Sequence, residues 1–327
     1  MALPVWFEAT TIGVLVAVLL ADLVIVSRRP HEPSHREAAA WVAGYVGMAL
    51  AFAVVLWLVV GPDPATEFTA GWLTEYSLSV DNLFVFVIIL TRFKVPRELQ
   101  QTALMVGIIV ALVLRGVFIV LGAELISRFT WVFYGFGLFL VYTAITLVRD
   151  RGEQEEDYEE NMVIRRVRKA LRVSPDFAGT RLRVRQDGRR LWTPLVVVFL
   201  ALGTTDLLFA LDSIPAIFGL TRDAFIVFTA NVFALMGLRQ LYFLLGGLLR
   251  RLVYLSIGLA VILAFIGVKL VLSAVHENSL PFLNGGQPVE AVPEIPIWLS
   301  LVVIVGVLAV ATAASLLRTR RDQLSAA

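Results

Sequence analysis

The chain has 327 residues, of which 58% are hydrophobic and 17% charged, and its mean hydropathy is +0.82. This apolar excess excludes a soluble globular domain and indicates a protein that crosses a lipid bilayer many times. The net charge is +2, and we expect no nucleic-acid partner. No Cys is present, which excludes disulfides, thiolate metal sites and Cys nucleophiles.

Nine apolar stretches are each long enough to cross about 30 Å of hydrocarbon as a helix. In chain order they cover roughly residues 5–26, 38–60, 68–90, 99–122, 129–148, 194–220, 223–248, 251–273 and 297–317. We therefore predict an all-α polytopic membrane protein with about nine transmembrane helices.

Basic residues fall almost entirely in alternate connections between these spans. Of the 28 Lys and Arg residues, 23 lie on one predicted side, and twelve of these lie between residues 149 and 193. The positive-inside rule puts that side in the cytoplasm, so we expect the N-terminus outside and the C-terminus cytoplasmic. The first span lacks a basic leader and is followed by Arg28 and Arg29, which predicts an uncleaved anchor.

The third and sixth spans each contain two acids with five residues between them. Glu75 and Asp81 lie in TEYSLSVDNLFVF, and Asp206 and Asp212 lie in TTDLLFALDSIPAI. A carboxylate at the centre of a bilayer costs about 2.5 to 3.5 kcal/mol on insertion scales, so a function is expected for such a set. The pattern indicates an ion path through the membrane.

The two acidic spans run in opposite directions if the count of nine is correct, which predicts an inverted repeat. The following spans match as well, with RGVFIVLG beginning at Arg115 and RQLYFLLG beginning at Arg239. Inverted repeats place a substrate site near the midplane, often on discontinuous helices. We predict an N-terminal two-helix segment (1–67), a first three-helix repeat (68–148), a charged cytoplasmic loop (149–193), a second repeat (194–273) and a C-terminal part with the last helix (274–327).

Pro215 predicts an interruption in the sixth span, because it cannot donate an amide to the carbonyl of Leu211. Acids six residues apart on a helix are separated by about 9 Å along the axis, too far for one small ion to bridge. We therefore expect Asp81 and Asp212 to share a midplane site, with Asn82 and Ser213 adding neutral oxygens. Glu75 and Asp206 would line the entry paths or exchange protons.

A static network is the alternative, in which Arg115 and Arg239 neutralise acids and tie the bundle together. Four acids against these two arginines leave two negative charges, which match one divalent cation. Asn231, in the seventh span, is either a further ligand or an interhelical hydrogen-bonding residue. Arg115, Arg239 and Asn231 are therefore candidate gating or charge-pairing residues. Lys269, near the outer end of the eighth span, is expected to reach the membrane interface, and Asp22, near the inner end of the first span, is expected to reach lipid headgroups.

Carboxylate, amide and carbonyl oxygens suit hard cations such as Mn²⁺, Mg²⁺ or Ca²⁺. The three His residues lie in predicted loops, and His276-Glu277 in HENSLP lacks the HExxH spacing of zinc proteases. The Gly-x-Gly-Asp pattern of intramembrane aspartyl proteases is missing around Asp81 and Asp212. We expect no catalytic residues, no resident cofactor and no enzymatic activity.

The charged loop 149–193 offers two local patterns and a surface for protein partners. Apolar residues at helical spacing from Val163 to Leu171 predict a short interfacial helix, with a solvated linker as the alternative. Further on, alternation around Asp187 and Gly188 predicts a two-residue β-hairpin.

The segments EYSLSVDNLFVF, SPDFAGTRLRVRQDGRRLWTP and FALDSIPAIFGLTRDAFIVFTANVFALMGLRQLYFLLGG resemble the TerC/Alx family of membrane proteins, related to the LysE superfamily of exporters. The resemblance covers roughly residues 70–272. It implies a bacterial inner-membrane protein that exports Mn²⁺, with an older association with tellurite resistance. It assigns the metal site to six residues: Glu75, Asp81, Asn82, Asp206, Asp212 and Ser213.

Together these observations predict a secondary transporter that exports a divalent cation, Mn²⁺ before Ca²⁺ or Mg²⁺, with proton exchange as the expected coupling. Two alternatives remain open. One is a non-transporting assembly or metal-loading factor whose charged network is structural, and the other is an exporter of an amino acid or an oxyanion, for which Arg115 and Arg239 would matter more than the acids.

Overall fold

A computed structural model describes residues 4–28, 34–129, 131–149, 173–186, 189–245, 254–277, 287, 289, 291–293 and 295–325. Its helices are α1 (Val5–Arg28), α2 (His35–Val59), α3 (Pro62–Arg92), α4 (Arg97–Arg128), α5 (Val132–Arg149), α7 (Pro194–Phe218), α8 (Ala224–Leu235), α9 (Leu238–Leu245), α10 (Leu255–His276) and α11 (Ile297–Ser325). Nine helical stretches of this described part, with α8 and α9 forming one of them, are long and apolar enough to cross a membrane. The predicted all-α polytopic fold is confirmed.

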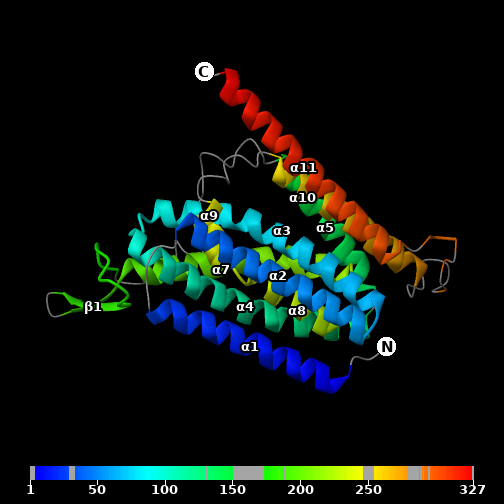
Figure 1. Cartoon of the computed structure of the whole chain (residues 1–327), viewed down its shortest axis with the longest axis horizontal. Coiled ribbons are helices and arrows are strands. Elements are labelled where there is room, and N and C mark those ends of the chain that lie inside the picture. Colours follow the sequence, from blue (N-terminus) through cyan, green and yellow to red (C-terminus); the bar gives the residue numbers. More distant parts are fainter. Residues whose placement is uncertain are drawn as a thin grey trace.

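The helices lie side by side in an elongated bundle, with α1 along one side and the C-terminal part of α11 extending away from it (Figure 1). α3 packs on α8, α4 packs on α7, and α5 packs on α10. Two halves related by an inverted repeat would make this cross-packing, since the first helix of each half meets the second helix of the other. The packing is consistent with the predicted repeat, which stays a prediction.

The backbones of α5 and α10 come close together at Gly137 and Gly267. A Cβ built on Gly137 would lie 2.6 Å from the carbonyl oxygen of Gly267, and one on Gly267 would lie 2.7 Å from the carbonyl oxygen of Gly137. Small residues permit this contact, which in a membrane contributes packing energy that the hydrophobic effect does not supply.

The seventh predicted span is broken, whereas its counterpart α4 is continuous. α8 ends at Leu235 and α9 begins at Leu238, and between them Gly237 has a φ of +78°. Gly adopts this left-handed conformation without the steric cost that a Cβ imposes. A Cβ there would also lie 2.7 Å from Cδ2 of Tyr45 in α2, so the break lies against a neighbouring helix.

The interruption expected at Pro215 is not found, and that prediction was wrong. α7 continues through Pro215 to Phe218. Because Pro215 lies in the last turn of α7, its missing amide removes only one backbone hydrogen bond, close to the point where the helix ends.

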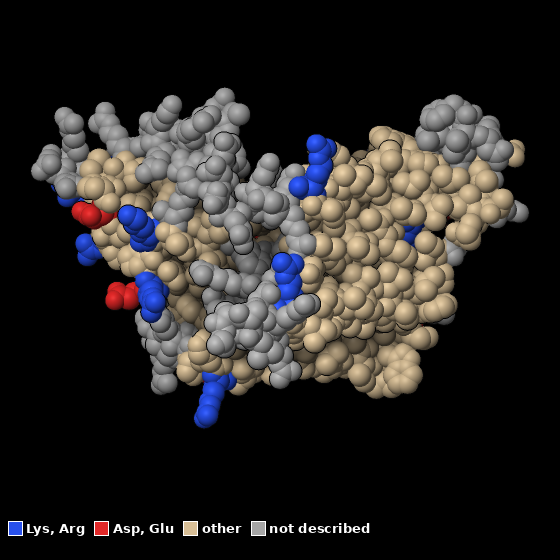
Figure 2. Space-filling view, turned by 90° about the horizontal axis from the view of Figure 1, so that it is seen from above, with Lys and Arg blue, Asp and Glu red and all other residues tan. Residues whose placement is uncertain are grey.

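The predicted hairpin is present. β1 (Arg183–Gln186) pairs with β2 (Arg189–Trp192) in antiparallel register, and Gln186 is opposite Arg189. The helix predicted from Val163 to Leu171 lies outside the described residues. We call the end of the bundle that carries β1 and β2 the hairpin end. Charged side chains gather there, further basic side chains lie near the middle of the same face, and its opposite half is almost uncharged (Figure 2).

Candidate ion site in the centre of the bundle

Arg115, near the middle of α4, gathers polar side chains from three other helices. Its guanidinium contacts the Glu75 carboxylate of α3 and donates to both Asp206 oxygens of α7, with distances of 3.2 and 3.4 Å. A further donor reaches Oδ1 of Asn231 in α8 at 3.0 Å. We call Glu75, Arg115, Asp206 and Asn231 the central cluster.

The central cluster is shielded from solvent and carries an excess of negative formal charge. Glu75 is 0% exposed, Arg115 1% and Asp206 3%. Two carboxylates face one guanidinium, so the ionised group has a formal charge of −1. Buried ion pairs need good geometry to offset desolvation, and an unbalanced acid adds to that cost. A cation or a proton would remove the imbalance.

Asn231 forms one hydrogen bond to a neighbouring helix and one within its own helix. Its Oδ1 accepts from Arg115, while its Nδ2 donates to the Val227 carbonyl at 3.3 Å. It is 1% exposed. Asn231 therefore orients the guanidinium that the two acids share.

Two buried hydroxyls lie on the acid-bearing helices without a hydrogen-bond partner among the described residues. The hydroxyls of Thr74 and Ser77 donate to carbonyls one turn earlier, as is usual in helices. Those of Ser79 and Ser213 do not, although each residue is 1% exposed. A buried polar atom without a partner calls for an explanation, and a bound ion is one. Ser213 was a predicted ligand, whereas Ser79 was missed because a lone Ser in an apolar span carries little signal.

Asp81 and Asp212 lie within α3 and α7, but the structure does not describe their side chains. Contacts between α3 and the end of α7 nevertheless indicate which residues of the two helices lie at the same depth in the bundle. Glu67 accepts a hydrogen bond from Thr221 at 2.5 Å, and Gly71 lies against Ile217. α3 and α7 are thus antiparallel.

Continuing this register toward the hairpin end brings Glu75 level with Asp212 and then Asp81 level with Asp206. The two levels are six residues, or about 9 Å, apart along α3. Each level then contains one acid from each predicted half. Arg115 contacts an acid of each level, Glu75 of one and Asp206 of the other. The predicted sharing of one site by Asp81 and Asp212 remains untested, although this register favours the two mixed pairs.

A compact metal cage is not formed by the side chains that the structure describes. Among them, no three His, Cys, Asp or Glu residues come together. Asn82, another predicted ligand, is 8% exposed on α3. The arrangement within this part of the chain is therefore a guanidinium held between acids.

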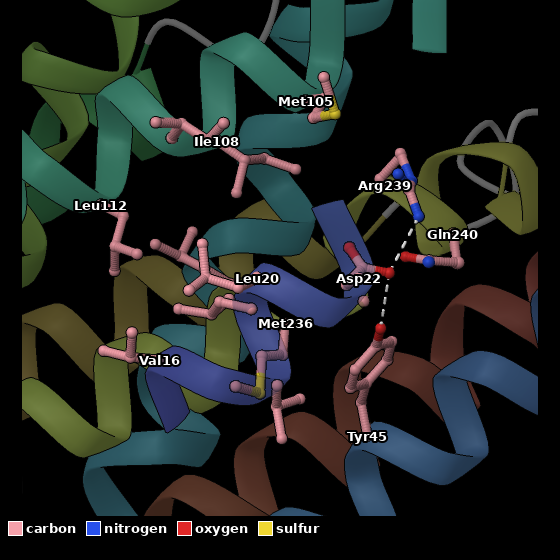
Figure 3. Close-up of a pocket in the computed structure, with 15 residues that line it drawn as sticks. Val16, Leu20, Asp22, Tyr45, Met105, Ile108, Leu112, Met236, Arg239 and Gln240 are labelled. Atoms are coloured by element: carbon pink, nitrogen blue, oxygen red, sulfur yellow. Dashed lines mark hydrogen bonds and ion pairs between the residues drawn. The ribbon is translucent and has the colours of Figure 1, made fainter. Parts of the chain in front are cut away.

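Among the described side chains, Arg239 does not pair with any of the four acids of the predicted site. It pairs with Asp22. Its Nη2 donates to Oδ1 of Asp22 in α1 at 3.2 Å, and the Tyr45 hydroxyl donates to the same oxygen at 2.9 Å (Figure 3). Asp22, close to the end of its span, was expected only to reach lipid headgroups. The sequence could not signal this pair, because its members are 217 positions apart.

A second polar group lies at the end opposite the hairpin. Here Glu67 bonds to Thr221, and Nζ of Lys269 donates to Oγ of Ser300 at 3.0 Å. Lys269 was expected to reach the membrane interface, but it is only 6% exposed. Packing of α11 on α10 covers it, so that prediction was wrong.

The sequence profile of the integral membrane protein TerC family matches residues 60–323. An uncharacterised membrane protein of Mycobacterium tuberculosis is 48% identical over 308 residues, which are 93% of this chain and 77% of the relative. One from Myxococcus xanthus is 39% identical over 314 residues, 96% of this chain and 93% of the relative.

The Escherichia coli protein Alx, whose name describes a proposed membrane-bound redox modulator, is 40% identical over 270 residues, 80% of this chain and 84% of the relative. No solved structure matches the chain significantly. The profile spans most of the chain, including the central cluster, so this protein belongs to the TerC family of integral membrane proteins.

Proposed function

We propose that this protein is a secondary transporter that exports a divalent metal cation, Mn²⁺ first, from the cytoplasm in exchange for protons. The observation that carries the proposal is the central cluster, where two carboxylates share one guanidinium in the middle of a membrane-crossing bundle. Hard-cation chemistry follows from the oxygen ligands. The choice of Mn²⁺ and the outward direction rest on the resemblance in sequence.

In this proposal the cation is held at one level at a time by one acid from each half, because the two levels are about 9 Å apart. Glu75 with Asp212, and Asp81 with Asp206, would supply carboxylates at two neighbouring levels. Ser79 and Ser213 would add oxygens that have no hydrogen-bond partner among the described residues. Binding of the cation would weaken the ion pair between Arg115 and one of the acids, because the cation would then neutralise that carboxylate in place of the guanidinium.

The membrane topology is part of the proposal. We infer that the hairpin end faces the cytoplasm of a bacterium and that the protein lies in the inner membrane, with the N-terminus outside. The support is the positive-inside pattern of the sequence and the gathering of charged side chains at the hairpin end. The charged loop 149–193 would then be a cytoplasmic surface for protein partners.

A non-transporting assembly or metal-loading factor is the second candidate, and one observation favours it. Arg115 contacts Glu75, Asp206 and Asn231 on three other helices, as a structural crosslink between helices would. The name of Alx raises redox chemistry, but the 327 residues include no Cys, so thiol exchange cannot come from their side chains. An anion exporter has less support, because each guanidinium nitrogen of Arg115 already has an acceptor among the described residues.

The test is Mn²⁺ flux into proteoliposomes that contain equal amounts of folded protein. Wild type would be compared with Glu75→Gln, Asp81→Asn and Asp212→Asn, with Ca²⁺ and Mg²⁺ as competitors. Glu124→Gln is the matched control, since Glu124 is an exposed acid on α4 that pairs with Arg128. The proposal expects wild-type flux, a loss of at least about tenfold in the three site variants, and no change in the control.

Two outcomes would reject a transporter in favour of the second candidate. One is the absence of flux by well-folded wild type under pH gradients of either direction. The other is that the site variants transport at the wild-type rate but melt at a lower temperature. That result would show that the acids stabilise the fold and do not bind the transported ion.

A further inference from the structure

A cavity of about 270 Å³ lies beside the break between α8 and α9. Figure 3 shows its walls, with side chains of α1 on one side and of α4 on the other. Val16 and Leu20 come from α1, and Met105, Ile108 and Leu112 come from α4. A single water takes about 30 Å³ of liquid volume, so the space is far larger than an ordinary packing defect.

The cavity opens onto the side of the bundle. Among its lining residues, Val16 is 47% exposed, Leu20 55% and Ile109 43%. The same three residues belong to stretches long and apolar enough to span a membrane, so this opening faces hydrocarbon. An apolar cavity that opens into a bilayer is filled by lipid tails, because water has no polar partners along these walls.

One end of the cavity is polar. Arg239 lines it and is only 6% exposed, and its Nη1 has no hydrogen-bond partner among the described residues. Asp22 accepts from Nη2, so it does not occupy the second donor. Leaving a buried charged donor without an acceptor is costly, and an acceptor from a ligand would remove that cost. The start of α9 at Leu238 adds the positive end of a helix beside it.

The depth of this donor fits the polar part of a phospholipid. Asp22, which accepts a hydrogen bond from Arg239, lies six residues before Arg28, the first basic residue after the apolar run of α1. Six helical residues measure about 9 Å. α1 is longer than the roughly 30 Å hydrocarbon layer requires, so Arg239 lies just inside the boundary where acyl chains join the headgroup.

The electrostatic surroundings select an anionic lipid. Four basic residues lie at the hairpin end near this cavity. They are Arg28 at the end of α1, Arg36 at the start of α2, and Lys94 and Arg97 in and beside the α3–α4 connection. Basic residues at a membrane surface attract anionic headgroups.

We propose that this cavity is a binding site for one anionic phospholipid of the leaflet at the hairpin end. An acyl chain lies between α1 and α4, and a phosphate or ester oxygen accepts the hydrogen bond from Nη1 of Arg239. The site is separate from the central cluster and does not depend on transport.

The test is lipid retention by the full-length protein, measured by native mass spectrometry. Delipidated protein would be incubated with phosphatidylglycerol or with phosphatidylcholine of identical acyl chains. Wild type is expected to keep one phosphatidylglycerol with about tenfold preference. Both lipids offer a phosphate oxygen to Arg239, but the choline cation of phosphatidylcholine is repelled by this guanidinium and by the basic residues around it.

Two variants separate the chain contact from the headgroup contact. Ile108→Trp fills the cavity and should abolish retention of both lipids, while Val113→Trp adds the same bulk at a 61% exposed position of α4 outside the lining and should change nothing. The pair Asp22→Asn with Arg239→Gln removes both charges together and should lose the headgroup preference while keeping a lipid.

The proposal would be overturned by equal retention of the two lipids by wild type, by unchanged retention in Ile108→Trp, or by a co-purified uncharged lipid in the same place. If transport were absent but phosphatidylglycerol retention followed the expected pattern, the proposed function would fail and the lipid site would stand. The reverse result would reject the lipid site alone.

Discussion

Arg115 and Arg239 begin matching motifs in the two halves of the sequence, yet their surroundings differ. Arg115 lies in a continuous helix and is held by acids from α3 and α7. Arg239 lies after a helix break and is held by Asp22 of α1, a helix outside both predicted repeats. Similar sequence therefore does not imply a similar partner, because an added helix can supply a new counter-charge.

The two arginines also differ in how fully they are satisfied. The guanidinium of Arg115 binds Glu75, Asp206 and Asn231, whereas Arg239 keeps one nitrogen without a partner among the described residues. The side chain of Asp22 is 30% exposed, while that of Glu75 is 0% exposed. The first centre is closed and charge-unbalanced, and the second is charge-balanced and open to a ligand. Four substitutions test this contrast.

The largest effect is expected from Arg115→Gln. This change leaves Glu75 and Asp206 buried without a positive partner, and breaking a buried pair in this way costs about 3 to 5 kcal/mol. The fall in melting temperature would be followed in detergent by intrinsic fluorescence. Arg128→Gln is the control, since the side chain of Arg128 is 70% exposed.

Combining Arg115→Gln with Glu75→Gln removes one of the stranded acids, so it should recover part of the lost stability. Unchanged melting of Arg115→Gln would mean that both acids are protonated in the resting protein.

A smaller loss is expected from Arg239→Gln. Asp22 keeps the hydrogen bond from Tyr45 and stays partly exposed, so the cost should be about 1 to 3 kcal/mol. Denaturant-induced unfolding in mixed micelles would measure it beside Arg115→Gln. A loss as large as that of Arg115→Gln would remove the distinction between a closed and an open centre.

Gly237→Ala tests the backbone break that separates the Arg239 region from its counterpart. At a φ of +78° a Cβ costs about 1 to 2 kcal/mol, and the contact with Tyr45 adds to this. Limited proteolysis should then cleave faster near α9. Gly135→Ala is the control, because a Cβ at Gly135 in α5 meets nothing within 4 Å; equal effects of the two changes would argue against strain at Gly237.

The smallest effect is expected from Tyr45→Phe, which removes one of the two hydrogen bonds to Asp22. About 0.5 to 1.5 kcal/mol should be lost. A double-mutant cycle with Asp22→Asn would isolate the pair, and a coupling energy near zero would show that Tyr45 does not hold Asp22 in place.

Local patterns in the sequence predicted the elements that depend on neighbouring residues. Apolar runs of sufficient length marked the spans, because a helix satisfies its own backbone in lipid. The turn pair Asp187 and Gly188 marked the hairpin because two residues suffice to reverse a strand. Acids within apolar spans pointed to residues of the central cluster, because a carboxylate in the hydrocarbon layer costs free energy whatever its tertiary surroundings.

Local patterns misled where a side chain or backbone depended on distant packing. Pro215 suggested a break but lies where α7 is about to end, while Gly237, in an unbroken apolar run, forms the real one against Tyr45. Lys269 was predicted to reach the membrane interface, but α11 covers it and its Nζ donates to Ser300 of that helix. Ser79 carried no signal at all.

The sequence by itself determined that this is a polytopic helical membrane protein with costly acids on two of its spans, because hydrophobic length and charge are properties of each segment. Only the tertiary structure decided which charges meet. Arg115 reaches Asp206 across 91 positions and Arg239 reaches Asp22 across 217. Such pairs are set by the packing of whole helices, which no single segment encodes.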